Sequence, residues 1–193
     1  LVDGLDVREY TFDALYNKLG YVTQKAVLFS GTVEDNVFFG QSAAEKTDAS
    51  LQAALSLSQA AEFVDKYPEK AAHPIAQLGR NVSGGQKQRL SIARALARTP
   101  EILIFDDSFS ALDYKTDATL REGLAKELPG TTKIIVAQRI STIRNADQIL
   151  VLDRGEIAGL GTHDALMASC TVYREIAMSQ LSEEELKKGG ASK

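Results

Sequence analysis

The chain has 193 residues, with 22 lysines and arginines against 26 aspartates and glutamates, a formal net charge of −4 and 44% hydrophobic residues. This composition is typical of an ordinary globular domain, and it excludes a disordered, collagen-like or disulfide-rich chain. The acidic residues are in slight excess, and the basic residues form no stripe. The chain therefore lacks a positively charged surface for a nucleic acid backbone, and we expect no nucleic-acid partner.

Cysteine content and hydropathy bear on the cellular compartment and on whether the chain contains a membrane-spanning helix. A single cysteine, Cys170, cannot form an intramolecular disulfide, which favours a reducing compartment. The longest apolar runs, such as residues 134–137, are far shorter than the roughly 20 residues of a membrane-spanning helix. The chain opens at Leu1 rather than at a methionine, and we expect it to be part of a longer protein.

The first half of the chain reads as a strand followed by a helical region. Residues 1–24 contain short extended pieces and a helical patch, and they end in a predicted buried strand at Tyr21 and Val22. A polar loop that carries Gln24 follows this strand. From about residue 31 to residue 98, alanine and leucine recur at helical spacing, which predicts a mostly α-helical lobe.

The second half reads as alternating strands and helices. The apolar runs at 102–105 and 134–137 do not alternate with polar residues, which predicts parallel strands covered on both faces. Residues 116–128 read as the crossover helix between them. Residues 148–160 read as a strand, a turn and a second strand, and the chain is helical from Asp164. We therefore predict an α/β core with a mainly parallel sheet (residues 1–30 and 99–180), an inserted α-helical subdomain (31–98) and a charged tail (181–193).

One segment predicts a helix start suited to an anion. Ser83 precedes Gln86 by three residues, which is the pattern of a capping box. Gly84 and Gly85 leave the first backbone N–H groups of the helix uncovered, and the positive end of the helix dipole attracts a phosphate. An ordinary capped helix with no ligand explains this segment equally well.

A second chemical feature is the acidic end of the strand at 102–105. Asp106 and Asp107 follow it directly. Ligands in open α/β sheets bind beyond the carboxyl ends of strands, and a carboxylate at this place can hold Mg²⁺. The alternative is a solvated acidic strand end.

Together, these segments resemble the nucleotide-binding domain of ATP-binding cassette (ABC) transporters. Residues 82–86 are similar to the signature motif of that family, residues 102–106 to its Walker B strand, and residues 110–113 to its D-loop. Gln24 matches the Q-loop, and Gln138 falls at the switch position of the H-loop. The resemblance implies a partial RecA-like P-loop NTPase core with an inserted α-helical subdomain.

The resemblance also implies ATP and Mg²⁺ as cofactors and assigns roles to individual residues. It implies catalytic roles for Asp107 and Gln138 and a metal site at Asp106 and Gln24. The residues that it implies for nucleotide binding are Gln24, Ser83, Gly84, Gly85, Gln86 and Asp113.

This chain also departs from the family pattern, and these departures are as informative as the matches. No G-x-x-x-x-G-K-[ST] phosphate-binding loop occurs in the 193 residues, so we expect this chain by itself neither to bind ATP tightly nor to hydrolyse it. Asp107 stands where the family usually has glutamate, and Gln138 where it usually has histidine. Such paired changes resemble the degenerate half of a heterodimeric multidrug-type exporter. The alternative is independent drift at the two positions.

The resemblance implies partners as well. Residues 27–37 are similar to the segment found in exporters, where the Q-loop region contacts a transmembrane domain. A second nucleotide-binding domain, from a different subunit, is expected to pair head to tail with this one at the cytoplasmic face of the membrane. Two other functions stay open. The first is a DNA-associated ABC ATPase, which usually has a long coiled coil between the positions of Gln24 and Ser83. The second is a folded fragment that acts only as an interaction module with exposed apolar sheet edges.

Overall fold

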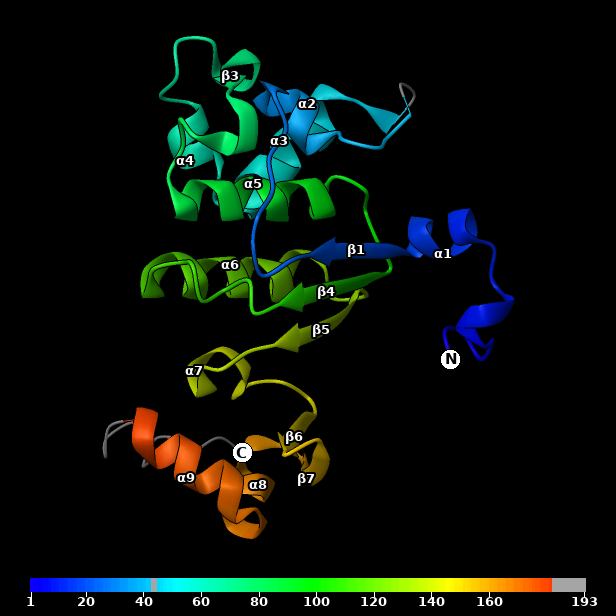
Figure 1. Ribbon diagram of the computed structural model, residues 1–193, viewed down its shortest axis with the longest axis vertical. Helices are drawn as coiled ribbons and strands as arrows, with labels where there is room; N and C mark the ends of the chain where they lie inside the picture. Colours follow the sequence, from blue (N-terminus) through cyan, green and yellow to red (C-terminus); the bar gives the residue numbers. More distant parts are fainter. Residues whose placement is uncertain (43–44, 182–193) are drawn as a thin grey trace. The chain divides into compact units, whose positions relative to one another are not determined.

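The computed structural model describes residues 1–42 and 45–181, and a three-stranded parallel sheet lies at the centre of its first part (Figure 1). The strand order is β1 (Leu19–Val22), β4 (Ile102–Asp106), β5 (Thr132–Val136). Leu19 lies opposite Ile102, which in turn lies opposite Thr132. The predicted α/β class with a parallel sheet is confirmed.

The chain divides into two units, residues 1–136 and residues 137–193. The predicted charged tail at 181–193 lies, beyond Leu181, outside the described residues. In the described part of the chain, no helix combines the length and the apolar character that crossing a bilayer requires.

One face of the sheet packs against helices. The buried side chains of β4, Leu103 and Phe105, belong to the same hydrophobic core as Leu120 and Leu124 of α6 (Tyr114–Glu127). Helix α5 (Gly84–Leu96) runs alongside β1 (Figure 1). Because successive side chains of a strand point to opposite faces, this packing explains why every second residue of β4 is buried.

The other face of the sheet is exposed in this chain. Tyr21 of β1 and Ile134 and Val136 of β5 all have exposed side chains. The prediction that β5 is covered on both faces is therefore wrong for the described residues. The cause is that no described residue of the first unit packs over this face.

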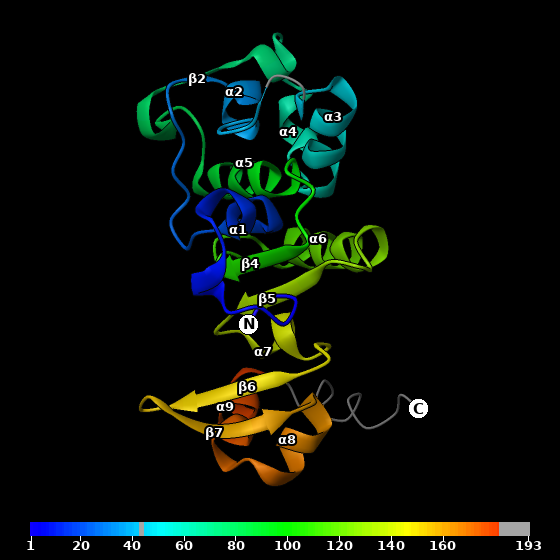
Figure 2. The ribbon, with the colours of Figure 1, turned by 90° about the vertical axis from the view of Figure 1, so that its right-hand side faces the viewer.

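The inserted helices lie on the side of α5 that faces away from the sheet (Figures 1 and 2). They are α2 (Val33–Val37), α3 (Asp48–Leu57) and α4 (Ala61–Val64). Capping boxes start two of them, at Thr32 for α2 and at Thr47 for α3. The remaining elements of this unit are short: η1 (Val7–Glu9), α1 (Phe12–Lys18), η3 (Lys70–Ala72), η4 (Gln77–Gly79) and the antiparallel pair β2 (Gly31–Thr32) and β3 (Pro74–Ile75).

The second unit is an antiparallel hairpin covered by helices (Figure 2). Its elements are α7 (Ile140–Ile143), β6 (Ile149–Asp153), β7 (Glu156–Gly161), α8 (His163–Ser169) and α9 (Thr171–Gln180). Arg154 and Gly155 form the turn of the hairpin, both with positive φ. This arrangement confirms the predicted strand, turn and strand followed by helix.

Candidate functional site

The two aspartates lie where β4 ends. Asp106 is the last residue of the strand, and the backbone N–H of Asp107 donates a hydrogen bond to the carbonyl of Val136 on β5 (2.9 Å). The buried alternation of β4 anchors the strand in the core, so both carboxylates are fixed at the carboxyl end of the sheet, where open α/β folds bind ligands.

Asp107 has a strained backbone. Its φ is 44°, in the left-handed region that residues with a side chain rarely adopt. The hydroxyl of Ser110 donates to the carbonyl of Asp107 (2.7 Å) and stabilises this turn. Such strain costs about 1–3 kcal/mol and is concentrated at functional sites. The carboxylate of Asp107, which is buried, is therefore held in a defined place rather than free in solvent.

Residues of β1 and of the loop after it contact both carboxylates. The side-chain amide of Gln24 donates from Nε2 to Oδ2 of Asp107 (3.1 Å). The hydroxyl of Tyr21 donates to Oδ2 of Asp106 (3.1 Å). The structure thus brings together three predicted site residues, Gln24, Asp106 and Asp107, with a fourth residue, Tyr21, that the sequence analysis treated only as a buried strand residue.

The start of α5 has the predicted capping box. Ser83 is the N-cap; its hydroxyl accepts from the N–H of Gln86 (3.2 Å), while Oε1 of Gln86 accepts from the N–H of Ser83 (2.8 Å). A Cβ added at Gly84 would meet no atom within 4 Å, so the backbone at the helix start is open to a ligand. The 13 residues of α5 add a helix dipole whose positive end lies here.

Helix α5 is tied to the other parts of the site by two contacts. Nε2 of Gln88, a buried side chain, donates to the carbonyl of Thr23, the residue before Gln24 (3.2 Å). A Cβ added at Gly85 would lie 3.6 Å from the carbonyl oxygen of Ala111. The start of α5 therefore borders the segment at 110–113.

Asp113 caps the following helix. Its carboxylate accepts from the N–H of Thr116 (2.9 Å) and from the hydroxyl of Thr116 (2.7 Å) at the start of α6. These bonds, the backbone bond first, lower the pKa of Asp113 below its usual value. Asp113 is therefore ionised at neutral pH and has a structural role in α6, whatever it binds in addition.

Gln138 lies in the second unit. Its carbonyl accepts from Nε2 of Gln180 on α9 (2.8 Å), and Oε1 of the same Gln180 accepts from the N–H of Ile140 (2.9 Å). This bidentate contact holds the turn between Gln138 and α7 against α9. Gln138 belongs to the second unit, whereas the cluster at the end of β4 belongs to the first.

The donor set at the end of β4 fits Mg²⁺. Magnesium prefers oxygen ligands and usually takes one or two from the protein and the rest from water and phosphates. Asp106 supplies a carboxylate, and Gln24, whose Nε2 donates to the neighbouring Asp107, supplies an amide oxygen, Oε1. These two residues are the ones that would hold the ion.

An exposed aromatic pair lies in the segment after Gln24. Phe29 and Phe39, exposed by 43% and 52%, stack with 4.3 Å between ring centroids. The guanidinium of Arg94 on α5 lies over both rings and donates to the carbonyls of Val27 (3.0 Å) and Asn36 (2.7 Å). Burial lowers the pKa of Arg94 from its usual value. A rigid apolar surface is thus anchored to the signature helix.

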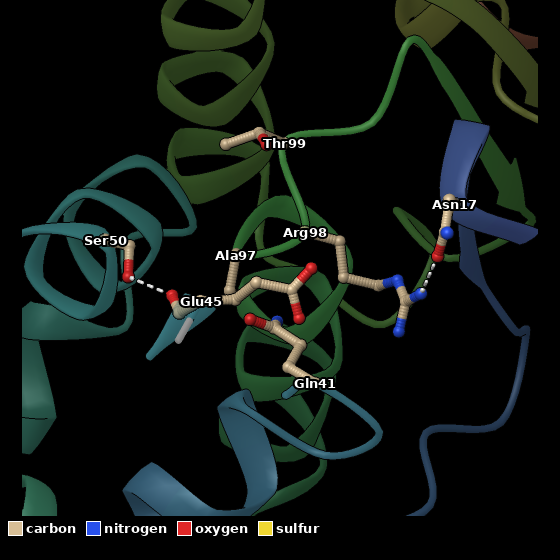
Figure 3. A pocket seen from close by; sticks show the side chains of 7 residues that line it. All are labelled: Asn17, Gln41, Glu45, Ser50, Ala97, Arg98 and Thr99. Carbon is tan, nitrogen blue, oxygen red and sulfur yellow. Dashed lines mark hydrogen bonds between the residues drawn. The ribbon is translucent and has the colours of Figure 1, made fainter. Parts of the chain in front are cut away.

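A separate polar cavity of about 360 Å³ lies between α1, α3 and the end of α5 (Figure 3). Arg98 extends across it to donate to Oδ1 of Asn17 (3.3 Å). The buried amide of Gln41 faces it without a hydrogen-bond partner among the described residues. The lining residues are Asn17, Gln41, Glu45, Ser50, Ala97, Arg98 and Thr99, and none of them is a predicted site residue.

Comparisons with known proteins identify the family and the fold. The sequence profile of the family described as "ABC transporter" matches residues 1–110. An uncharacterized ABC transporter ATP-binding protein of Mycobacterium tuberculosis is 46% identical over 93% of this chain, and an ATP-dependent lipid A-core flippase of Syntrophus aciditrophicus is 38% identical over 96% of it. The structure is similar to that of a bacterial Atm1-family ABC exporter with ATP bound, with a TM-score of 0.89, 36% identity and 95% of this chain covered. The chain spans 31% of the length of these two curated relatives and 32% of the exporter chain.

Proposed function

This chain belongs to the ABC transporter family, and on that premise we propose that it is the ATP-binding and ATP-hydrolysing domain of an ABC exporter. The observation that carries the proposal is the cluster at the end of β4, where Gln24 and Tyr21 hold the carboxylates of Asp107 and Asp106. The similarity to a bacterial Atm1-family exporter and to a lipid A-core flippase supports export rather than import. In the described part of the segment between Gln24 and Ser83, α3 with its 10 residues is the longest helix, which gives no support to a DNA-associated ATPase with a long coiled coil.

In this proposal ATP and Mg²⁺ are the cofactors. Asp106 and Gln24 would hold the ion, which would supply positive charge that offsets the negative charge of the phosphates. Asp107 accepts a proton from the attacking water, and Gln138 donates a hydrogen bond to the γ-phosphate. The residues proposed to contact nucleotide are Gln24, Ser83, Gly84, Gly85, Gln86 and Asp113. The 193 residues contain no phosphate-binding loop sequence, so nucleotide binding by this chain alone is expected to be weak.

We assign a weak ATP site to this chain. The carboxylate of Asp107 is one methylene shorter than that of glutamate and is further held by Gln24, so it reaches the attacking water less well. Gln138 can donate a hydrogen bond but cannot become a cation. In a head-to-tail pair with a different subunit, the signature at 83–86 completes the partner's competent site instead.

The remaining partner is a transmembrane domain. The stacked Phe29 and Phe39 form an exposed apolar surface directly after the Q-loop, and Arg94 anchors that surface to α5. Movement of α5 when the two domains close on ATP would reach the membrane part through this contact. The domain therefore works at the cytoplasmic face of the membrane.

The weak site is tested by restoring the usual residues in the complete exporter. Asp107→Glu together with Gln138→His should raise the single-turnover hydrolysis rate at this chain's own site by about tenfold or more, since a general base contributes about 10²- to 10⁴-fold. The two changes act in one transition state, so their joint effect should exceed the product of the single effects. The two single variants are the controls, and purely multiplicative effects would show that the positions drifted independently.

A further inference from the structure

Tyr21 has an unusual place for an aromatic strand residue. In the parallel register it pairs with Ile104, and Asp106 follows two residues later on the same face of β4. Side chains at such diagonal positions are within reach of an aromatic ring. The ring of Tyr21 spans this distance, and its hydroxyl lies 3.1 Å from Oδ2 of Asp106.

We propose that Tyr21 is a positioning residue that fixes the Asp106 carboxylate for metal binding. This inference rests on the proposed function, which assigns Asp106 to Mg²⁺. The hydroxyl of Tyr21 donates to Oδ2, which restricts rotation of the carboxylate about its Cβ–Cγ bond and would leave Oδ1 available to an ion. Hydrogen-bond partners of metal ligands contribute about 10- to 100-fold to metal affinity in other proteins.

The electrostatics of the pair agree with this role. Tyr21 donates to an anion, and a charge-assisted hydrogen bond is stronger than a neutral one. The hydroxyl donates to one carboxylate oxygen of Asp106, so the bond favours one orientation of the carboxylate.

The ring of Tyr21 contributes little to the core. Its side chain is 55% exposed, whereas that of its neighbour Val22 is fully buried. Removing only the hydroxyl therefore leaves the packing of β1 intact. Tyr16 of α1 offers a matched control, since it is also 55% exposed and its ring stacks on Phe12 away from both aspartates.

The test measures metal affinity directly, in the complete transporter subunit that contains this chain. Mn²⁺ replaces Mg²⁺ as the probe, and its binding is followed by electron paramagnetic resonance in the presence of a non-hydrolysable ATP analogue. We expect Tyr21→Phe to raise the dissociation constant for Mn²⁺ about tenfold and Tyr16→Phe to leave it unchanged. Because only metal affinity is lost, saturating Mg²⁺ should restore the single-turnover hydrolysis rate of Tyr21→Phe at this chain's own site.

A third variant separates this inference from the proposed function. If Asp106→Asn weakens Mn²⁺ binding and Tyr21→Phe does not, Asp106 is a ligand and the inference about Tyr21 is overturned. If neither variant changes Mn²⁺ affinity, the metal role of Asp106 itself fails. A loss of maximal rate in Tyr21→Phe that saturating Mg²⁺ does not restore would also contradict a positioning role, because it would show a purely structural effect.

Discussion

At the scale of single residues, the second unit contains a buried histidine, His163. His163 is 7% exposed, and its Nδ1 lies 2.8 Å from the hydroxyl of Tyr173. Burial, with a smaller contribution from the charge of Arg144, lowers the pKa of His163 below its ordinary value of 6.5. The folded unit therefore favours the neutral imidazole.

This depressed pKa predicts a pH dependence with a definite sign. Below pH 6.5 the unfolded chain binds a proton that the folded unit binds less well, so the free energy of unfolding is largest above pH 6.5 and falls as the pH drops towards the folded pKa. Thermal unfolding measured at a series of pH values should show this loss, and His163→Gln should reduce it. Equal slopes for wild type and His163→Gln would contradict the assignment.

The residues of the site differ in how far the sequence predicts them. Gln24, Asp106 and Asp107 could be predicted because polar residues directly after apolar strands meet at one edge of a parallel sheet. The structure places them together. Tyr21 could not, since its apolar surroundings predicted burial, and its contact with Asp106 depends on the register of β1 against β4. The one signal in the sequence was the hydroxyl group of Tyr21, a polar group on an aromatic residue near the strand end.

At the scale of elements, close contact between β1 and α5 positions the loop that carries Gln24 relative to α5. Gly20 makes this contact possible: a Cβ there would lie 2.8 Å from Cδ2 of Leu103 and from Cγ of Pro100, and 3.1 Å from the carbonyl of Ala95 on α5. A glycine inside a strand often marks such a close approach. The carbonyl oxygen of Ala95 cannot move away unless α5 shifts with it.

We therefore expect Gly20→Ala to destabilise the first unit. Overpacking of this kind costs about 1–3 kcal/mol. Equilibrium urea unfolding should show a lower midpoint at an unchanged slope. Gly130→Ala is the matched control, because a Cβ at Gly130 meets nothing within 4 Å and should leave the midpoint unchanged. An unchanged midpoint for Gly20→Ala would contradict the close contact.

The elements with strong local signals could be predicted, and those defined by pairing could not. The capping box of Ser83 and Gln86 predicted the start of α5 at Gly84. The strand predicted at 134–137 lies instead at Thr132–Val136, because pairing with β4 begins at Thr132. The apolar pattern missed these first positions because Thr132 and Lys133 are polar. The pair β2–β3 was missed because two residues per strand give no periodicity.

At the scale of the whole molecule, each unit has an exposed apolar sheet face. In the first it contains Ile134 and Val136, and in the second the hairpin exposes Leu150, Leu152, Ile157 and Leu160. Apolar runs predicted these strands but not their exposure, because periodicity reports which residues are apolar and not what covers them. The fold class could be predicted because several motifs in a fixed order specify it together.

The central claim is that this chain serves two ATP sites unequally: its signature completes the partner's site, while its own Asp107 lines a weak one. The open space at Gly84 makes this testable, since a Cβ at that position would meet no atom within 4 Å. Gly84→Asp therefore adds a negative charge against the partner's triphosphate, and Gly84→Ala is its uncharged control.

The most direct test is the steady-state ATPase rate of the complete heterodimeric exporter that carries these variants. We expect Gly84→Asp to lower the rate by about 100-fold or more, as loss of stabilisation of the transition-state charge does elsewhere, while the partner still binds ATP. Gly84→Ala should have a much smaller effect, and Asp107→Ala should retain most of the rate because that site is already weak. If Asp107→Ala stops hydrolysis and Gly84→Asp does not, the assignment of weak and competent sites is reversed.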